Sequence, residues 1–305
     1  MDTGSDLLSK LALPPSRPGR APESYHLDRR NANLGNIATL PLAAGVHQSD
    51  ERRSGRACTL LTPSDPAGTI VFAHGGAYCA GGPGGRLVGV LSHLAAASGW
   101  RVLSISYGLA PENPFPAALH DAAAFVLDAL EFGQPIVLAG ESAGGGLMAA
   151  LGARIAQRAP EIPLQALVLV SPWLDLTGTA GTIVSRAQTD RLFSPMRHRQ
   201  AAADYLQGAP AEDPLASALF ADLANVPPTQ IWAGGDEILL DDAVGFARRL
   251  ALAGRSVELH VSAGMQHVFP VLFPDLPASR RALGVMAQFI RTPPPRPNNQ
   301  GDDRP

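Results

Sequence analysis

The chain has 305 residues, 46% of them hydrophobic and 17% charged, which is enough to bury the core of one large globular domain. Its formal net charge of −3 at pH 7 provides no basic stripe for a nucleic-acid backbone, so we expect a small-molecule partner and no nucleic acid. Lys10 is the only lysine. The chain therefore lacks the lysine-containing phosphate loop and has almost no place for Schiff-base chemistry.

The cysteine content and the apolar runs place further limits on the protein. Cys58 and Cys79 are the only cysteines, which gives neither a disulfide framework nor a zinc-binding spacing, and we expect no metal. No apolar run approaches the ~18–20 residues of a membrane span, and the N-terminal stretch lacks the basic and apolar regions of a signal peptide. We expect an unprocessed cytoplasmic protein.

Short apolar runs rich in Val, Ile and Leu alternate with helical patterns along the chain. The runs predict strands within residues 69–76, 101–108, 135–142, 166–172, 229–236 and 256–262. Helical patterns fall within residues 115–132, 144–159 and 241–254. Near-continuous apolar strands are typical of a parallel sheet covered on both faces. The alternation predicts a doubly wound α/β fold.

Two segments interrupt this alternation. Residues 1–45 and 176–215 lack strand periodicity, and we expect both to form a lid, or cap, over the active site. The core would then comprise residues 46–175 and 216–291. Residues 292–305 are rich in proline and charge and are expected to be a disordered tail.

Ser142 lies in Gly140-Glu141-Ser142-Ala143-Gly144, a G-x-S-x-G pattern. In this pattern a strand ends in a sharp turn that exposes the serine hydroxyl before a helix begins. The pattern alone is short in a glycine-rich chain and also fits a passive turn. Here it follows an apolar strand and precedes a helical pattern, which favours a nucleophilic serine.

The stretch AHGGAYCAGG follows the first predicted strand and suggests an oxyanion-binding loop. Two glycines after a strand allow backbone N–H groups to approach a substrate without obstruction by side chains. Gly75 and Gly76, together with the N–H of Ala143, are therefore candidate oxyanion donors. His74 is expected to support the shape of this loop and to take no direct part in catalysis.

A nucleophilic serine requires a base and an acid, which follow it in the order Ser, acid, His in this class of fold. His198 lies in the expected cap and precedes every candidate acid, and His260 lies within a predicted strand. His267 follows the last strand, where a loop can bring the imidazole to Ser142. The residues themselves leave two neighbouring acids open, Asp236 and Glu237.

The segments HGGAY, YGLAPENPFPAAL, GESAGGG, SPWLDL and GMQHVF occur in this order between about Ala73 and Phe269. With them the chain resembles the bacterial hormone-sensitive-lipase-like carboxylesterases, family IV of the α/β-hydrolase superfamily. The resemblance implies an eight-stranded, mostly parallel sheet with helices on both faces and a helical cap. It also implies hydrolysis of short- to medium-chain carboxylic esters without a cofactor, and a possible homodimer through the last strand.

The resemblance also bears on individual residues. It assigns Ser142 as nucleophile and His267 as base, and the family register after the acid favours Glu237 over Asp236, because Leu239 and Asp241 then match the family pattern. Gly108 departs from the family, which usually has arginine there, so we expect that a salt bridge or a packing contact beneath the site is missing.

Substrate selection is expected to depend on the walls of the site. We consider Tyr78, Cys79, Glu141 and Leu174 as candidate pocket residues. The same scaffold also supports lactonase, amidase or deacetylase activity, or ligand binding without catalysis.

Overall fold

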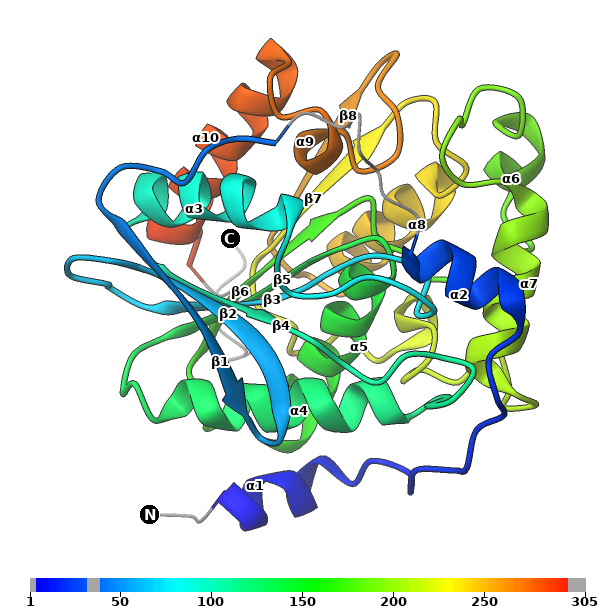
Figure 1. Ribbon diagram of the computed structural model, residues 1–305, viewed down its shortest axis with the longest axis horizontal. Helices are drawn as coiled ribbons and strands as arrows, with labels where there is room; N and C mark the ends of the chain where they lie inside the picture. Colours follow the sequence, from blue (N-terminus) through cyan, green and yellow to red (C-terminus); the bar gives the residue numbers. More distant parts are fainter. Residues whose placement is uncertain (1–3, 32–38, 296–305) are drawn as a thin grey trace, which may run out of the picture.

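The computed structural model describes residues 4–31 and 39–295, drawn as a ribbon in Figure 1. Within these residues, eight strands form one sheet in the order β1-β2-β4-β3-β5-β6-β7-β8. The strands are β1 Val46–Arg53, β2 Arg56–Pro63, β3 Thr69–Ala73, β4 Arg101–Ile105, β5 Ile136–Glu141, β6 Leu164–Val170, β7 Thr229–Gly234 and β8 Val257–Ser262. The strands from β3 to β8 are parallel, whereas β2 is antiparallel to both β1 and β4. The predicted mostly parallel α/β sheet is confirmed.

Helices cover both faces of this sheet, as Figure 1 shows. One face carries α3 Arg86–Ser98, α9 Phe269–Leu272 and α10 Pro277–Arg291, and the other carries α4 Ala117–Leu130, α5 Ala143–Arg158 and α8 Leu240–Leu252. The central strands β3 and β5 are buried at every position. Two apolar cores, one on each side of the sheet, therefore hold the layers together.

All six strands and all three helices that the sequence predicted are present. The hairpin of β1 and β2 was not among the predicted runs. β1 reads VHQSDERR and lies at the edge of the sheet, where every residue of the strand after Val46 is at least partly accessible to water. Its polar sequence therefore does not show the apolar pattern of a buried strand.

The carboxyl ends of β3, β5, β7 and β8 carry the predicted chemistry. His74 follows β3 directly, Ser142 follows β5, Glu237 follows β7 and His267 follows β8. Because parallel strands end at the same edge of a sheet, these four segments converge there. The order of the strands reverses at β3, which is the position where ligands bind in open α/β sheets.

The two helices of the N-terminal segment pack against different parts of the fold. Helix α1 (Gly4–Leu11) packs against α4 and α5, with Leu11 buried in the core, and Figure 1 shows it beneath α4. Helix α2 (Ser24–Asn31) instead lies beside α7 (Pro195–Leu206) of the second predicted cap segment. Helix α1 thus contacts the helices on one face of the sheet and α2 contacts α7, while a cap formed by residues 1–45 remains a prediction. Of the predicted disordered tail, residues 296–305 lie outside the described part of the chain.

Arg56 lies beside Gly108, where a missing salt bridge or packing contact was expected. Asp121 of α4 accepts the backbone N–H of Gly108 at 2.8 Å and pairs with Nε of Arg56 at 2.5 Å. A Cβ atom placed on Gly108 would lie only 3.2 Å from a guanidinium nitrogen of Arg56. Arg56 of β2 therefore occupies the space beside residue 108 and supplies a salt bridge there.

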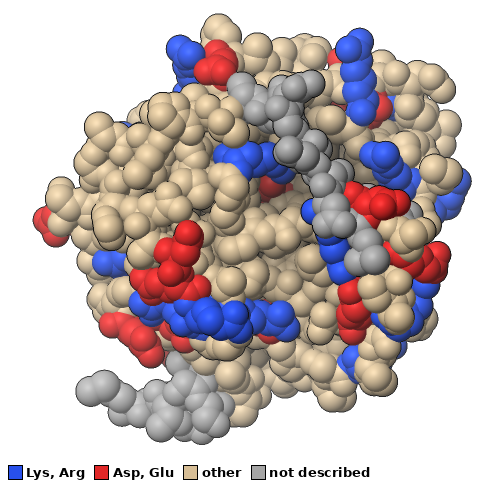
Figure 2. All heavy atoms as spheres, viewed as in Figure 1, with Lys and Arg blue, Asp and Glu red and all other residues tan. Residues whose placement is uncertain are grey.

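Charged side chains are scattered over the face drawn in Figure 2, where arginines lie next to acidic residues and much of the surface is uncharged. Within the described residues, no helix combines the length and the apolar character that crossing a bilayer requires.

Candidate active site

Ser142 lies in the sharp turn between β5 and α5 with φ 53° and ψ −122°. A non-glycine residue rarely adopts this backbone conformation, and it is found where the surrounding structure enforces it. The small neighbours are required by close packing. A Cβ on Gly144 would lie 2.2 Å from the carbonyl oxygen of Ala73, and one on Gly140 would lie 2.5 Å from the backbone of Gly144. The predicted strand, turn and helix around this serine are all present.

His267 connects the serine to a carboxylate. Its Nε2 lies 2.9 Å from Oγ of Ser142 and its Nδ1 lies 3.0 Å from Oε2 of Glu237. All three side chains are buried. A carboxylate can only accept a hydrogen bond, so Nδ1 of the neutral imidazole carries the hydrogen. Nε2 is therefore unprotonated and can accept the hydroxyl proton of Ser142.

Of the two neighbouring acids, Glu237 is the one in contact with His267. Asp236 is only partly buried, its backbone N–H donates to the carbonyl of Met265 at 3.2 Å, and its carbonyl accepts from Oγ1 of Thr189 at 3.0 Å. These contacts hold the turn in which both acids lie. The longer side chain of Glu237 extends inward from that turn to the imidazole.

The surroundings of His267 favour its charged form. Burial by itself lowers the pKa of the imidazole, but the hydrogen bond and the negative charge of Glu237 outweigh it, with smaller contributions from Asp190 and Glu141. The net effect raises the pKa of His267 above its ordinary value. The site therefore stabilises the imidazolium that would form when Ser142 loses its proton.

The structure differs from the sequence prediction at Gly75. Its N–H donates to Oε1 of Glu141 at 3.2 Å and is therefore already engaged. Gly76 has φ 118°, and within the described part of the chain neither its N–H nor that of Ala77 donates to a protein acceptor. The N–H of Ala143, in the first turn of α5, has no acceptor within the helix. The N–H groups available for an oxyanion are thus those of Gly76, Ala77 and Ala143.

His74 lies where a supporting residue of this loop was expected. Its Nδ1 donates to the carbonyl of Gly75 at 2.6 Å, and its ring stacks on Tyr107 with centroids 4.3 Å apart. The hydroxyl of Tyr107 donates to the His74 carbonyl at 2.7 Å. Burial lowers the pKa of His74 to about 4, so the ring is neutral at pH 7 and remains a donor to the loop.

The four candidate pocket residues, Tyr78, Cys79, Glu141 and Leu174, are all buried with at most 1% of their surface exposed. Tyr78 stacks on Tyr205 of α7 with centroids 3.8 Å apart, which joins the oxyanion loop to the second cap segment. Glu141 holds Gly75 on one side and lies 3.4 Å from Arg86 on the other. Contact of these side chains with a substrate remains a prediction.

Three residues that were not predicted as site residues, Phe193, Trp173 and His198, form an aromatic cluster packed against His267. The ring of Phe193 stacks on His267 with centroids 5.8 Å apart, and Trp173 packs edge-on against Phe193. The indole N–H of Trp173 donates to Nε2 of His198 at 2.8 Å. His198 was not expected to be the base, and its hydrogen bond with Trp173 holds this aromatic cluster together. Phe193 lies in a segment without periodicity, so no sequence pattern identified it.

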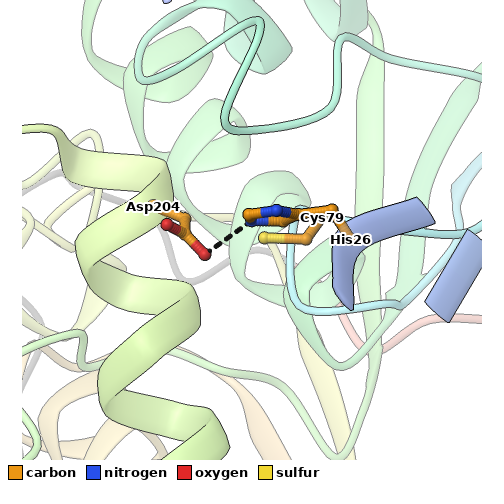
Figure 3. A group of neighbouring side chains, drawn as sticks. All are labelled: His26, Cys79 and Asp204. Atoms are coloured by element: carbon orange, nitrogen blue, oxygen red, sulfur yellow. Dashed lines mark hydrogen bonds and ion pairs between the residues drawn. The ribbon is translucent and has the colours of Figure 1, made fainter. Parts of the chain in front are cut away.

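Figure 3 shows a second cluster, in which His26 of α2, Cys79 of the oxyanion loop and Asp204 of α7 lie together. Their potential ligand atoms lie within 4.8 Å of one another, and all three residues are buried. His26 accepts the Glu23 N–H at Nδ1, at 3.0 Å, so its Nε2 carries the hydrogen donated to Asp204 at 2.9 Å. Asp204 also pairs with Arg20.

These contacts indicate that His26 and Arg20 bind Asp204 as a structural link, here called the clamp, between the N-terminal segment with α2 and helix α7. A metal ion at Nε2 of His26 would have to displace the hydrogen that Asp204 accepts, and Nδ1 would then have to carry a hydrogen facing the Glu23 N–H. The charge of Asp204 is already balanced by Arg20. The cluster therefore joins α2 to α7 beside Cys79, which lies in the loop after β3.

Comparison with known proteins agrees with this geometry. Residues 70–271 match the model of a family described as having the alpha/beta hydrolase fold. An acetyl-hydrolase from Streptomyces hygroscopicus is 36% identical over 278 residues, which cover 89% of each chain. The crystal structure of a mutant of the esterase E40 has a TM-score of 0.79 and 32% identity, covering 94% of this chain and 95% of that one. An esterase from the bacterial hormone-sensitive lipase family has a TM-score of 0.76 and 31% identity, covering 95% and 99%.

Proposed function

The chain belongs to the α/β-hydrolase esterases related to bacterial hormone-sensitive lipase, and we propose that it hydrolyses short- to medium-chain carboxylic esters through an acyl-enzyme on Ser142. The observation that carries the proposal is the continuous hydrogen-bonded chain from Ser142 through His267 to Glu237. The enzyme is an ester hydrolase, as its relatives are named. We propose the catalytic roles of Ser142, His267 and Glu237 and the preference for short to medium acyl chains.

In the first half of the reaction, Nε2 of His267 takes the proton of Ser142 as Oγ attacks the ester carbonyl carbon. The carbonyl oxygen becomes an oxyanion and accepts hydrogen bonds from the N–H groups of Gly76, Ala77 and Ala143. When the tetrahedral intermediate collapses, the bond to the alcohol oxygen breaks. His267 donates its proton to that oxygen, and the alcohol leaves.

In the second half, a water molecule replaces the alcohol. His267 takes a proton from this water, which attacks the acyl carbon, and the same oxyanion site is used again. The bond to Oγ then breaks, Ser142 recovers its proton from His267 and the carboxylic acid leaves. Glu237 accepts the hydrogen bond of Nδ1 and stabilises the charged imidazole in both halves.

A substrate panel tests this proposal. Nitrophenyl esters from acetate to decanoate, lactones and anilides are assayed with the wild-type enzyme and with Ser142→Ala as the matched control. We expect the highest kcat/KM among the shorter esters and a loss of at least about a thousandfold in the variant. Hydrolysis of lactones or anilides in preference to esters would reassign the substrate class. Ester turnover equal in both proteins would contradict the proposal.

We also propose that α2 and residues 176–215 form a cap. The hydrogen bond from His26 of α2 to Asp204 of α7 supports this proposal, because it joins the two segments.

We further propose that the enzyme forms a homodimer through β8. This strand is the last of the sheet, and Val261 on it is 46% exposed, so the edge is accessible to a second chain. Light scattering should give the mass of two chains for the wild type and of one chain for Val261→Lys. A wild-type monomer would rule the dimer out.

A cytoplasmic location is proposed as well. Cys58 and Cys79 are the only two cysteines of the chain and both are buried, and so few cysteines provide no disulfide framework, as is usual in a reducing compartment. Fractionation of the producing cells, with activity measured in each fraction, tests this proposal, and activity outside the cytoplasm would contradict it.

A further inference from the structure

Asp190 lies in the cap segment between α6 (Gly181–Ser185) and α7, and it is 8% exposed. Its Oδ1 accepts the backbone N–H groups of Leu192 and Phe193, both at 2.9 Å. Its Oδ2 accepts the backbone N–H of Ile238, also at 2.9 Å. One carboxylate thus connects the cap to the turn after β7, across 48 residues of sequence.

Both ends of this connection adjoin the candidate active site. The ring of Phe193 stacks on the imidazole of His267, with an angle of 22° between the planes. Ile238 directly follows Glu237, whose Oε2 lies 3.0 Å from Nδ1 of His267. A shift of Asp190 would therefore be transmitted to the ring packed on the base and to the backbone that carries the acid.

We propose that Asp190 is a positioning residue of this esterase, which fixes Glu237 and the Phe193 ring so that the imidazole of His267 keeps its orientation. A turn-forming aspartate needs only the two N–H groups within its own loop. The third bond, to Ile238, lies outside that loop and is the feature that a purely local role leaves unexplained. The inference rests on the proposed function for its kinetic consequence but not for its structural one.

The electrostatic surroundings agree with this role. The charged groups that act on His267 are Glu237 in the turn after β7, Asp190 in the cap and Glu141 at the end of β5. Glu141 lies 3.4 Å from Arg86, whereas the hydrogen-bond partners described for Asp190 are all neutral backbone N–H groups. The negative charge of Asp190 therefore also stabilises the imidazolium.

Two variants separate geometry from charge. Asp190→Asn keeps the shape but removes the charge and one acceptor, because an amide nitrogen cannot accept a hydrogen bond. Asp190→Glu keeps the charge but displaces the oxygens. Asp222→Asn is the matched control, since Asp222 is exposed and, among the described residues, its Oδ1 accepts the N–H of Ala224 within its own turn. Thermal unfolding of each protein is measured first, and Asp190→Glu takes the place of Asp190→Asn if the latter does not fold.

Two measurements are made on the folded proteins. The pKa of His267 is followed by NMR titration of its ring proton, assigned by comparison with His267→Ala, and needs no substrate. The kcat and KM are measured with a short-chain nitrophenyl ester. We expect Asp190→Asn to lower the pKa of His267 and to lower kcat at least about tenfold with KM changed less than about twofold. We expect Asp190→Glu to lower kcat similarly while the pKa stays near that of the wild type.

The outcomes are distinct. If both Asp190 variants match Asp222→Asn in kcat and in the pKa of His267, Asp190 is only a turn residue and the inference is wrong. A change confined to KM would also contradict it. If the wild type turns over no ester, the proposed function fails, whereas the NMR comparison still decides whether Asp190 acts on His267.

Discussion

Oε2 of Glu237 lies 3.0 Å from Nδ1 of His267, while the adjacent Asp236 uses its backbone to hold the turn. Replacement of Glu237 by Gln should lower kcat by about two orders of magnitude or more, since an amide can present the wrong group to Nδ1 and no longer balances the imidazolium charge. Asp236→Asn, which leaves the backbone contacts intact, is the matched control and should keep most of the activity. Steady-state kinetics of both proteins decide the matter, and the reverse ranking would move the acid to Asp236.

The raised pKa of His267 sets the pH range of activity. The base must be neutral to take the proton of Ser142, so kcat/KM should decline as pH falls through the pKa of His267. Burial lowers the pKa of His267, but Glu237, Asp190 and Glu141 together outweigh it, so the midpoint of the decline should lie above about 6.5, the ordinary value for histidine. A pH profile of kcat/KM with a short-chain ester provides the measurement. A profile that stays level down to pH 5 would contradict this account of His267.

His74 should make the protein sensitive to acid. Burial lowers its pKa to about 4 in the folded state, whereas an unfolded histidine titrates near 6.5. Between these values the unfolded chain binds a proton that the folded chain does not, so stability falls as pH decreases through this range, by about 3 kcal/mol in total.

The variant His74→Phe keeps an aromatic ring against Tyr107 but cannot titrate. It should be less stable than the wild type at pH 7.5, since the donor to Gly75 is lost, and its further loss on going to pH 4 should be about 3 kcal/mol smaller. Urea unfolding at the two pH values measures both quantities. Equal losses in the two proteins would show that His74 is not the group responsible.

The clamp between α2 and α7 can be tested through the thiol that it covers. Cys79 has no exposed surface and lies beside His26 and Asp204. Asp204→Asn should loosen α2 and increase the rate at which Cys79 reacts with a thiol reagent, by about tenfold or more. Cys58 is an internal control, because burial raises the pKa of its thiol to about 11 and it lies on β2.

Peptide mass spectrometry identifies which cysteine has reacted. The double variant with Cys79→Ser should lose the additional labelling. An unchanged rate at Cys79 in Asp204→Asn would mean that other contacts, such as those of Arg30 with Glu112, hold α2 in place.

The sequence predicted the parts of the site that depend on local pattern. Ser142 was recognisable because its turn requires small residues at Gly140 and Gly144, and His267 because it follows the last strand. Gly75 was predicted as a candidate oxyanion donor, and its N–H instead donates to a carboxylate in the structure. The residue that occupies its N–H, Glu141, lies 66 positions away, and no local pattern reports that contact.

The residues that the sequence missed share this property. Asp190 contacts Ile238 across 48 positions, and Arg56 of β2 meets Asp121 of α4 only in the folded protein. Helix α1 was expected with the cap, but it contacts α4 and α5 and buries Leu11 in the core, a contact that depends on surfaces formed only after folding. Such contacts between distant segments can be recognised once the sheet order is known.

The central claim is that Ser142 is the nucleophile activated by His267, and covalent labelling tests it most directly. A sulfonyl fluoride should add one group per chain, abolish ester hydrolysis in parallel and appear by peptide mass on Ser142, with no labelling in Ser142→Ala and slow labelling in His267→Ala. A single adduct on another residue, with ester hydrolysis retained in Ser142→Ala, would contradict the account.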